Sequence, residues 1–294
     1  DIDGNAERVR TARKSASGAD LIVFSELVLS GYPPEDLVLK PFFQDKVEAA
    51  AMALAAETAD GGPAVLVGAP WRDNGDLRNA VLLLDGGEVK AIRYKRDLPN
   101  YGVFDEKRVF SAGPMPGPIN FRDVRIGVPV CEDIWSPDVC ECLQESGAEF
   151  FLVVNGSPFE SDKREVRLQH AVARVSESGL PLAYVNQVGG QDELVFDGGS
   201  FVLNGDSSLA AQQPMFVEDI LLTEWRREGD GWNVVVTDRV AHPEGHEATY
   251  RAMVLGLRDY VNKNGFPGVV LGMSGGIDSA LTAAVAVDAL GPDK

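Results

Sequence analysis

The chain has 294 residues, a formal net charge of -18 and 45% hydrophobic residues. This length and composition predict a globular protein with more than one domain. The acidic balance argues against a nucleic-acid-binding surface, because phosphate contacts need a basic stripe, so we expect small molecules or proteins as partners. We expect no membrane span and a cytoplasmic location, since no apolar run approaches roughly 20 residues and the N-terminus lacks signal-peptide character. The three cysteines form neither a disulfide framework nor a recognisable metal-binding pattern.

Predicted helices and strands alternate along most of the chain. Helical periodicity covers residues 6–17 and 42–58, and short apolar strand patterns cover residues 21–24, 65–69, 80–84 and 89–94. The sequence 85–87, Asp-Gly-Gly, predicts a turn that joins the last two of these strands as a hairpin. After a loop-rich segment at 96–120, strand patterns at 125–130, 150–154 and 182–188 alternate with helical patterns at 137–146 and 162–178. This order predicts a layered α/β sandwich.

The pattern changes after residue 200. Short strands and turns with polar inserts continue to about residue 240, and a helix is predicted at 244–262. Glycine- and proline-containing segments at 229–231 and 242–245 interrupt the periodicity, which predicts a domain boundary near 230–245. We therefore divide the chain into a first domain at 1–235 and a second at 236–294.

A Ser-Gly-Gly-x-Asp-Ser sequence follows this last helix. The apolar residues before it predict a buried strand at 269–272, and a helix is predicted after it. Adjacent glycines let successive backbone N–H groups converge on an anion, and the helix N-terminus points to the same place, so the segment predicts a phosphate-binding loop. The residues of this loop are Gly272, Met273, Ser274, Gly275, Gly276, Ile277, Asp278 and Ser279. The alternative is a glycine-rich turn without a ligand.

This loop lacks the Gly-Lys-Ser/Thr ending of a Walker loop. It resembles the signature of the ATP-pyrophosphatase (PP-loop) family, whose members hold the β- and γ-phosphates of ATP while a carboxylate or carbonyl becomes adenylated. The resemblance implies that ATP and Mg2+ bind here. The amides of Gly275 and Gly276 would hold pyrophosphate, and Asp278 and Ser279 would serve the Mg2+–phosphate group.

Three reactive side chains stand at the ends of predicted strands. Glu26 follows the first strand, Lys95 closes the strand that ends at residue 94, and Cys131 follows the apolar run 126–130. Reactive side chains collect at strand ends in α/β folds, although each residue alone is more often a surface charge or a buried thiol. A nearby lysine is expected to lower the pKa of the Cys131 thiol. The three histidines have no helpful sequence context, which disfavours a Cys-His mechanism.

The order Glu26, Lys95, Cys131 resembles the Glu-Lys-Cys triad of the nitrilase (carbon-nitrogen hydrolase) family. The resemblance covers residues 1 to about 230, and residues 98–108 look like the glutaminase domain of glutamine-dependent NAD synthetases, whose second half is a PP-loop domain. It implies a nitrilase-type α-β-β-α sandwich without its first strand, followed by the first elements of a Rossmann-like PP-loop domain. We therefore expect the chain to be truncated at both ends.

The resemblance also implies a role for each member of the triad. Glu26 would be the general base that takes the thiol proton, and Cys131 would attack the side-chain amide carbon of glutamine. Lys95 would stabilise the resulting oxyanion together with the backbone N–H of Glu132. Glu106 matches a further glutamate that orients the lysine.

Three more positions match residues that grip glutamine in that family. They are Tyr101, Ser157 and Lys163, and Lys163 would pair with the α-carboxylate. The complete enzyme implied is an ATP-dependent ligase whose substrates are glutamine, ATP and deamido-NAD. Its glutaminase half needs no cofactor, and ammonia passes from one site to the other. We also expect a homo-oligomer formed through the nitrilase-type domain.

Two other readings remain open. The first is a stand-alone nitrilase-family amidase that acts on a small carboxamide, in which the apparent PP-loop is a structural turn. The second is a non-enzymatic interaction scaffold, against which the intact Glu26, Lys95 and Cys131 argue.

Overall fold

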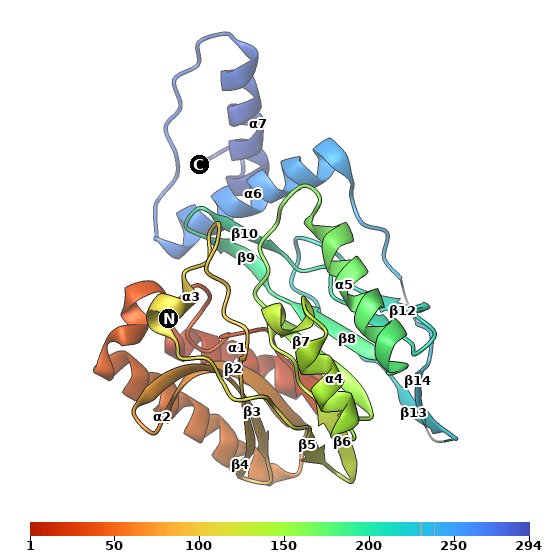
Figure 1. Ribbon diagram of the computed structural model, residues 1–294. Coiled ribbons are helices and arrows are strands. Elements are labelled where there is room, and N and C mark those ends of the chain that lie inside the picture. The colour runs from red at the N-terminus through yellow and green to blue at the C-terminus, as the bar shows by residue number, and fades with distance from the viewer. Residues whose placement is uncertain (230, 238) are drawn as a thin grey trace.

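Two β-sheets form the centre of the computed structural model, which describes residues 1–229, 231–237 and 239–294 (Figure 1). The first sheet has the order β1-β2-β3-β4, with β1 (Leu21–Val23), β2 (Ala64–Asp73), β3 (Asp76–Asp85) and β4 (Glu88–Tyr94). The second has the order β12-β11-β8-β7-β6-β5. Its strands are β5 (Ile119–Phe121), β6 (Val124–Gly127), β7 (Phe150–Asn155), β8 (Leu182–Asn186), β11 (Phe201–Leu203) and β12 (Leu209–Gln212).

Helices cover the outer face of each sheet (Figure 1). The first sheet packs against α1 (Ile2–Ser15) and α2 (Pro41–Glu57), and the second against α4 (Asp138–Glu145) and α5 (Lys163–Ser178). A further apolar layer lies between the two sheets. The α-β-β-α sandwich predicted from the sequence is therefore confirmed.

Alternation along β2 explains how one strand serves two layers. Val65 and Val67 pack with the helices, whereas Ala64 and Leu66 pack against the second sheet. An apolar run without polar alternation is typical of a strand that is buried on both faces. Burial of one such Val or Leu side chain contributes about 1.5–3 kcal/mol, so both layers stabilise this strand.

The hairpin between β3 and β4 forms where the sequence predicts it. Asp85 pairs with Glu88, and the two residues between them, Gly86 and Gly87, have φ values of +59° and +90°. Two consecutive residues in this left-handed region favour glycine, which carries no Cβ. The strands themselves are longer than the apolar runs predicted, because their polar ends also pair, as Asp73 does with Asp76.

Other predicted elements are altered in detail. The segment predicted as loop-rich contains α3 (Glu106–Val109) and β5, and the strand predicted at 182–188 divides into β8 and β9 (Val188–Gln191). Short 3-10 turns also occur at η1 (Glu35–Leu39), η2 (Thr58–Asp60) and η3 (Cys131–Ile134). β9 forms a hairpin with β10 (Leu194–Asp197), and β13 (Trp225–Glu228) forms one with β14 (Gly231–Val234). The domain boundary expected near 230–245 includes residues 230 and 238, which lie outside the described residues, and it stays a prediction.

The C-terminal part leaves the sandwich at α6 (Gly245–Lys263), which contacts the β9–β10 hairpin, and ends in α7 (Ile277–Leu290) (Figure 1). The predicted buried strand at 269–272 is wrong: these residues are extended but belong to no strand, and Val270 is fully exposed. A parallel strand needs a neighbouring strand for its backbone hydrogen bonds, and none of the described residues supplies one here. Among the described residues, no helix is both long and apolar enough to cross a bilayer.

Candidate active site

Lys95 lies at the centre of a buried ion network. Its Nζ atom donates to Oε1 of Glu26 and to Oε1 of Glu106, each at 2.7 Å. Lys95 and Glu26 are fully buried, and Glu106 is 5% exposed. Burial alone would lower the pKa of Lys95, but the charges of Glu106 and Glu26 outweigh this effect and hold the pKa well above its usual value. The lysine is therefore a fixed cation inside the sandwich.

Glu26 is held from both of its oxygens. Besides Lys95, its Oε1 accepts from Asn79 Nδ2 at 2.7 Å, and its Oε2 accepts from the backbone N–H of Gly156 at 2.8 Å. The segment that carries Glu26 runs close against β2, where a Cβ at Gly68 would lie 2.3 Å from the backbone nitrogen of Leu27. Only glycine at position 68 permits this approach, which sets the depth at which the carboxylate enters the site.

Glu106 keeps one oxygen unused. Its Oε1 accepts from Lys95 and from the Tyr32 hydroxyl at 2.7 Å, whereas Oε2 is buried without a hydrogen-bond partner among the described residues. Burial raises the pKa of Glu106, Lys95 opposes the rise, and Glu26 adds to it. An unpaired buried acceptor is costly, so this oxygen is suited to receive an N–H from a bound molecule.

Cys131 occupies a strained backbone position next to this network. Its φ is +47°, a left-handed value that is rare for a residue with a Cβ, and the residue is 5% exposed at the start of η3. Burial raises the pKa of the thiol, and Glu26 raises it further, whereas Lys95 lowers it; the net shift is well above the usual value. Lys95 lowers the pKa of the thiol as the sequence predicts, but burial and the surrounding carboxylates outweigh this effect, so the net shift is upward.

The residues matched to glutamine binding surround this centre unevenly. Tyr101 is 47% exposed and donates its hydroxyl hydrogen to both carboxylate oxygens of Glu132, at 3.0 and 2.9 Å. Lys163, at the start of α5, has its Nζ 3.1 Å from Glu160 Oε1 and 4.9 Å from the centre of the Trp135 ring.

Opposite charges therefore meet next to Cys131. Burial raises the pKa of Glu132, while the hydrogen bond from Tyr101 and the charges of Lys95 and Lys163 oppose the rise. A carboxylate and an ammonium group are thus within electrostatic reach of each other near the thiol.

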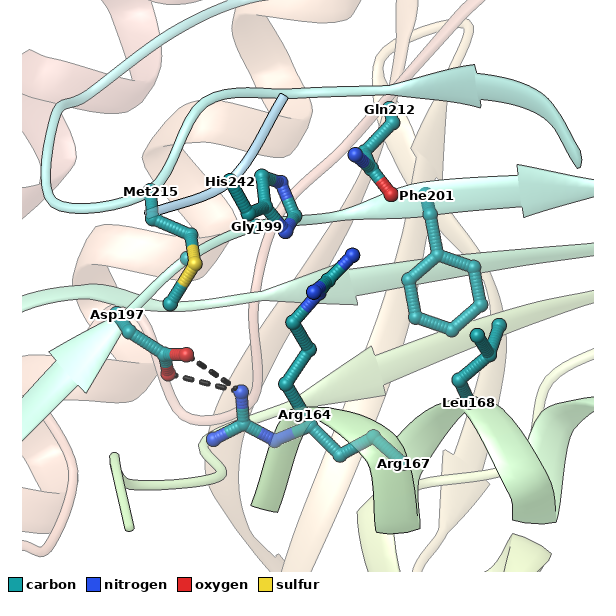
Figure 2. A pocket seen from close by; sticks show the side chains of 10 residues that line it. Arg164, Arg167, Leu168, Asp197, Gly199, Phe201, Gln212, Met215 and His242 are labelled. Atoms are coloured by element: carbon teal, nitrogen blue, oxygen red, sulfur yellow. Dashed lines mark hydrogen bonds and ion pairs between the residues drawn. The ribbon is translucent and has the colours of Figure 1, made fainter. Parts of the chain in front are cut away.

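The side chain of Ser157 is buried, with 3% of its surface exposed. Its Oγ accepts from Arg167 Nε at 3.0 Å, and its backbone N–H donates to Asn186 Oδ1 at 3.0 Å. Arg167 in turn donates to both oxygens of Asp197 at 2.8 Å. This buried pair lines a small pocket together with His242, and Cys131 does not line it (Figure 2). Ser157 is thus bound into a structural network, which fixes the turn that follows Gly156.

Sequence reasoning missed several side chains that complete the site. Asn79 and Tyr32 bind Glu26 and Glu106, and Asp133 accepts three backbone N–H groups around the cysteine. A polar residue inside a strand that is otherwise apolar was the available signal for Asn79. Tyr32 and Asp133 carried none, because the partner of Tyr32 lies 74 residues away along the chain and the partners of Asp133 are backbone N–H groups, two of them at least 36 residues away.

The predicted phosphate-binding loop lies apart from this cluster, at the start of α7 (Figure 1). Ser274 Oγ is 3.1 Å from Ser279 Oγ, and Gly275 has a φ of +82° with open space where a Cβ would stand. No side chain caps the N-terminus of α7 among the described residues. Free helix-terminal N–H groups beside hydroxyls fit a phosphate, so this loop is chemically suited to the ATP that the sequence implies.

Comparison with known proteins identifies the larger part of the chain. The sequence profile of the carbon-nitrogen hydrolase family matches residues 1–229. The chain belongs to the carbon-nitrogen hydrolase family. A second profile, that of NAD synthase, matches residues 249–294.

Relatives of similar sequence extend the comparison over the whole chain. The glutamine-dependent NAD(+) synthetase of Rhodobacter capsulatus is 50% identical over 292 residues, which is 99% of this chain and 53% of the relative. The enzyme of the same name from Acinetobacter baylyi is 39% identical and is covered to 54%. The chain thus spans about half the length of these curated relatives, and the resemblance to glutamine-dependent NAD synthetases is confirmed.

Solved structures agree. The glutamine-dependent NAD+ synthetase from Acinetobacter baumannii, in complex with ADP, superposes with a TM-score of 0.92 at 40% identity, over 99% of this chain and 55% of that one. An amidase from Nesterenkonia sp. superposes with a TM-score of 0.63 at 27% identity, over 72% of this chain and 81% of that one. Both structures share the sandwich with this chain. Of the two, the NAD+ synthetase matches nearly the entire chain, whereas the amidase matches the sandwich.

Proposed function

We propose that the sandwich hydrolyses the side-chain amide of glutamine at Cys131. The observation that carries the proposal is the buried Lys95 between Glu26 and Glu106, next to a buried thiol at a strained turn. A fixed cation beside a nucleophile is suited to a substrate that develops negative charge on oxygen during attack. Complete burial of charged side chains is costly unless they are paired. Buried charge networks of this kind cluster at functional sites, which supports a catalytic role for this one.

Each step of the reaction has a group to perform it. Glu26 accepts the thiol proton as the sulfur attacks the amide carbon, and Lys95 stabilises the oxyanion together with the backbone N–H of Glu132. Glu26 then returns the proton to the departing nitrogen, so ammonia leaves and a glutamyl thioester remains. Water, deprotonated by Glu26, hydrolyses the thioester to glutamate and restores the thiol.

The charges of Lys163 and Glu132 near Cys131 support an amino acid as the substrate rather than a simple amide. Lys163 can pair with an α-carboxylate and Glu132 can pair with an α-ammonium group, while the buried thiol receives the distal amide. Tyr101 orients Glu132 through its hydroxyl. The stand-alone amidase reading needs none of these charges, and the NAD synthase match at 249–294 also weighs against it.

The released ammonia would serve a second reaction. We assign to the complete protein the ATP-dependent conversion of deamido-NAD to NAD, in line with the relatives that share both parts of this chain. Ser274 to Ser279 would hold the phosphates of ATP, and the Asp278 carboxylate would face the accompanying Mg2+. ATP would supply the adenylate group that activates the carboxylate of deamido-NAD for attack by ammonia. The homo-oligomer and the cytoplasmic location stay predictions.

The proposal is tested by measuring ammonia and glutamate released from glutamine by this chain and by its Cys131→Ala variant. We expect the variant to lose hydrolysis completely, because no other group in the site can form the thioester. Cys142→Ala is the matched control, since Cys142 is half-buried in α4 and should leave turnover unchanged. Hydrolysis that survives in Cys131→Ala, or is absent from the unaltered chain, would contradict the proposal.

A further inference from the structure

Asp133 receives backbone hydrogen bonds from two separate segments. Its Oδ1 accepts the N–H groups of Arg96 at 3.0 Å and Asp97 at 2.8 Å, and its Oδ2 accepts the N–H of Val130 at 2.9 Å. The side chain is buried, with 1% of its surface exposed. One buried carboxylate therefore accepts three main-chain N–H groups.

These donors flank two residues of the proposed mechanism. Arg96 and Asp97 directly follow Lys95, just after the end of β4, and Val130, which directly precedes Cys131, lies three residues after the end of β6. The two strands belong to different sheets of the sandwich. Asp133 is thus a link between the sheets at the point where the lysine and the cysteine emerge.

We propose that Asp133 is a positioning residue that fixes the separation of Lys95 Nζ and Cys131 Sγ by tying the backbone of both to one carboxylate. This inference rests on the proposed function. Stabilisation of an oxyanion by a preorganised donor depends on its distance from the reacting carbon, and a misplacement of about 1 Å can cost roughly 10²-fold in rate. The strained φ of Cys131 makes such a restraint necessary, because an unrestrained turn would relax toward ordinary backbone angles.

A carboxylate is required at position 133 because it is the only side chain of that size that accepts on both oxygens. In Asp133→Asn, one oxygen becomes an NH2 group, which donates and cannot accept. In one orientation of the amide, its NH2 group faces the N–H of Val130. In the other orientation, it faces the N–H groups of Arg96 and Asp97. One of the two links is lost while the volume of the side chain is unchanged.

The test measures glutamine hydrolysis per folded molecule of this chain, at about pH 8. Burial raises the pKa of Asp133 to about 7, so the carboxylate is ionised under these conditions. Circular dichroism gives the folded fraction of each variant, and turnover is divided by that fraction. We expect Asp133→Asn to lower kcat per folded site by about 10²-fold with the KM for glutamine within threefold, because no hydrogen bond joins Asp133 to the side chain of Tyr101 or Lys163 among the described residues.

Two further variants complete the design. Glu149→Gln is the matched control: Glu149 accepts the N–H of Arg125 at 2.9 Å, at the opposite end of β6, and its loss should leave kcat per site unchanged. Asp133→Glu keeps the charge but displaces it, and should also lower kcat per site. A purely structural role would reduce the folded fraction and leave kcat per folded site intact, which overturns the inference, as does failure of both Asp133 variants to fold. If the unaltered chain does not hydrolyse glutamine, the proposed function itself is overturned.

Discussion

At the scale of single residues, the site is defined by charges that the fold has removed from water. Lys95, Glu26 and Glu106 would each cost several kcal/mol if buried alone, and they are tolerated because each is paired and hydrogen-bonded. Burial and the charge of Glu26 hold the pKa of the Cys131 thiol well above its usual value, which explains why the resting cysteine is protonated. The proposed hydrolysis then requires Glu26 to take the thiol proton while substrate is bound, because the thiol is not permanently ionised.

The raised pKa of Cys131 predicts a particular pH dependence for its alkylation. Below the pKa, the thiolate fraction rises about tenfold for each pH unit, so the rate of reaction with iodoacetamide should keep rising up to pH 9. The rate is followed by mass spectrometry of the peptide that contains Cys131, with Cys142 in the same digest as the internal reference. A rate that levels off below pH 8 would mean that the lysine dominates and the thiol is ionised at rest.

At the scale of elements, two strand ends deliver the reactive groups and glycine permits the close packing between them. β1 ends just before Glu26 and β4 ends just before Lys95, so two edge strands of one sheet supply base and cation. β2 and β3 lie between them and contribute Gly68 and Asn79. The depth of the site therefore depends on how closely the chain after β1 approaches β2.

This dependence predicts the effect of Gly68→Ala. The added Cβ would meet the nitrogen of Leu27 at 2.3 Å and the carbonyl oxygen of Ser25 at 2.7 Å, and neither backbone atom can move without displacing Glu26. We expect the variant to lose about 1–3 kcal/mol in the free energy of unfolding and to lose glutamine hydrolysis beyond its unfolded fraction. Gly18→Ala, where no atom lies within 4 Å of the added group, is the control. Urea unfolding and hydrolysis rates measure both effects, and unaltered values for Gly68→Ala would refute the argument.

At the scale of the whole molecule, stability is distributed unevenly. The sandwich has three continuous apolar layers, whereas α7 buries only Val285 and Ala289 and contacts α6, where Tyr250 donates to Asp288 at 2.6 Å. The segment before α7 has extended, exposed backbone. The proposed glutamine site and the predicted phosphate-binding loop therefore lie in parts of the chain that are packed very differently.

This contrast predicts the pattern of amide hydrogen exchange. Residues 270–276 should exchange within seconds, because their backbone groups face water and lack a β-ladder, while β2 and β3 should exchange only through global opening. Exchange followed by mass spectrometry of short peptides gives both rates in one experiment. Protection of 270–276 comparable to that of β2 would show that the segment forms a strand in solution.

Much of this protein could be derived from local sequence alone. The periodicity of apolar residues and the Asp-Gly-Gly turn were sufficient for the order of the main helices and strands of the sandwich, because each reflects contacts within a few residues. The positions of Glu26, Lys95 and Cys131 at strand ends were likewise visible as local features. The strand predicted at 269–272 failed for the complementary reason: an apolar run becomes a strand only when a neighbouring strand pairs with it.

Only the tertiary structure decided how these residues act together. The link from Asp133 to both strand ends, the unused oxygen of Glu106 and the raised pKa of Cys131 arise from groups dozens of residues apart. The sign of that pKa shift is a balance of burial against several charges, and it depends on distances that no sequence pattern encodes. Sequence therefore determined which chemical groups the site contains, and the packing of two sheets determined their charges, their separation and the order in which they can react.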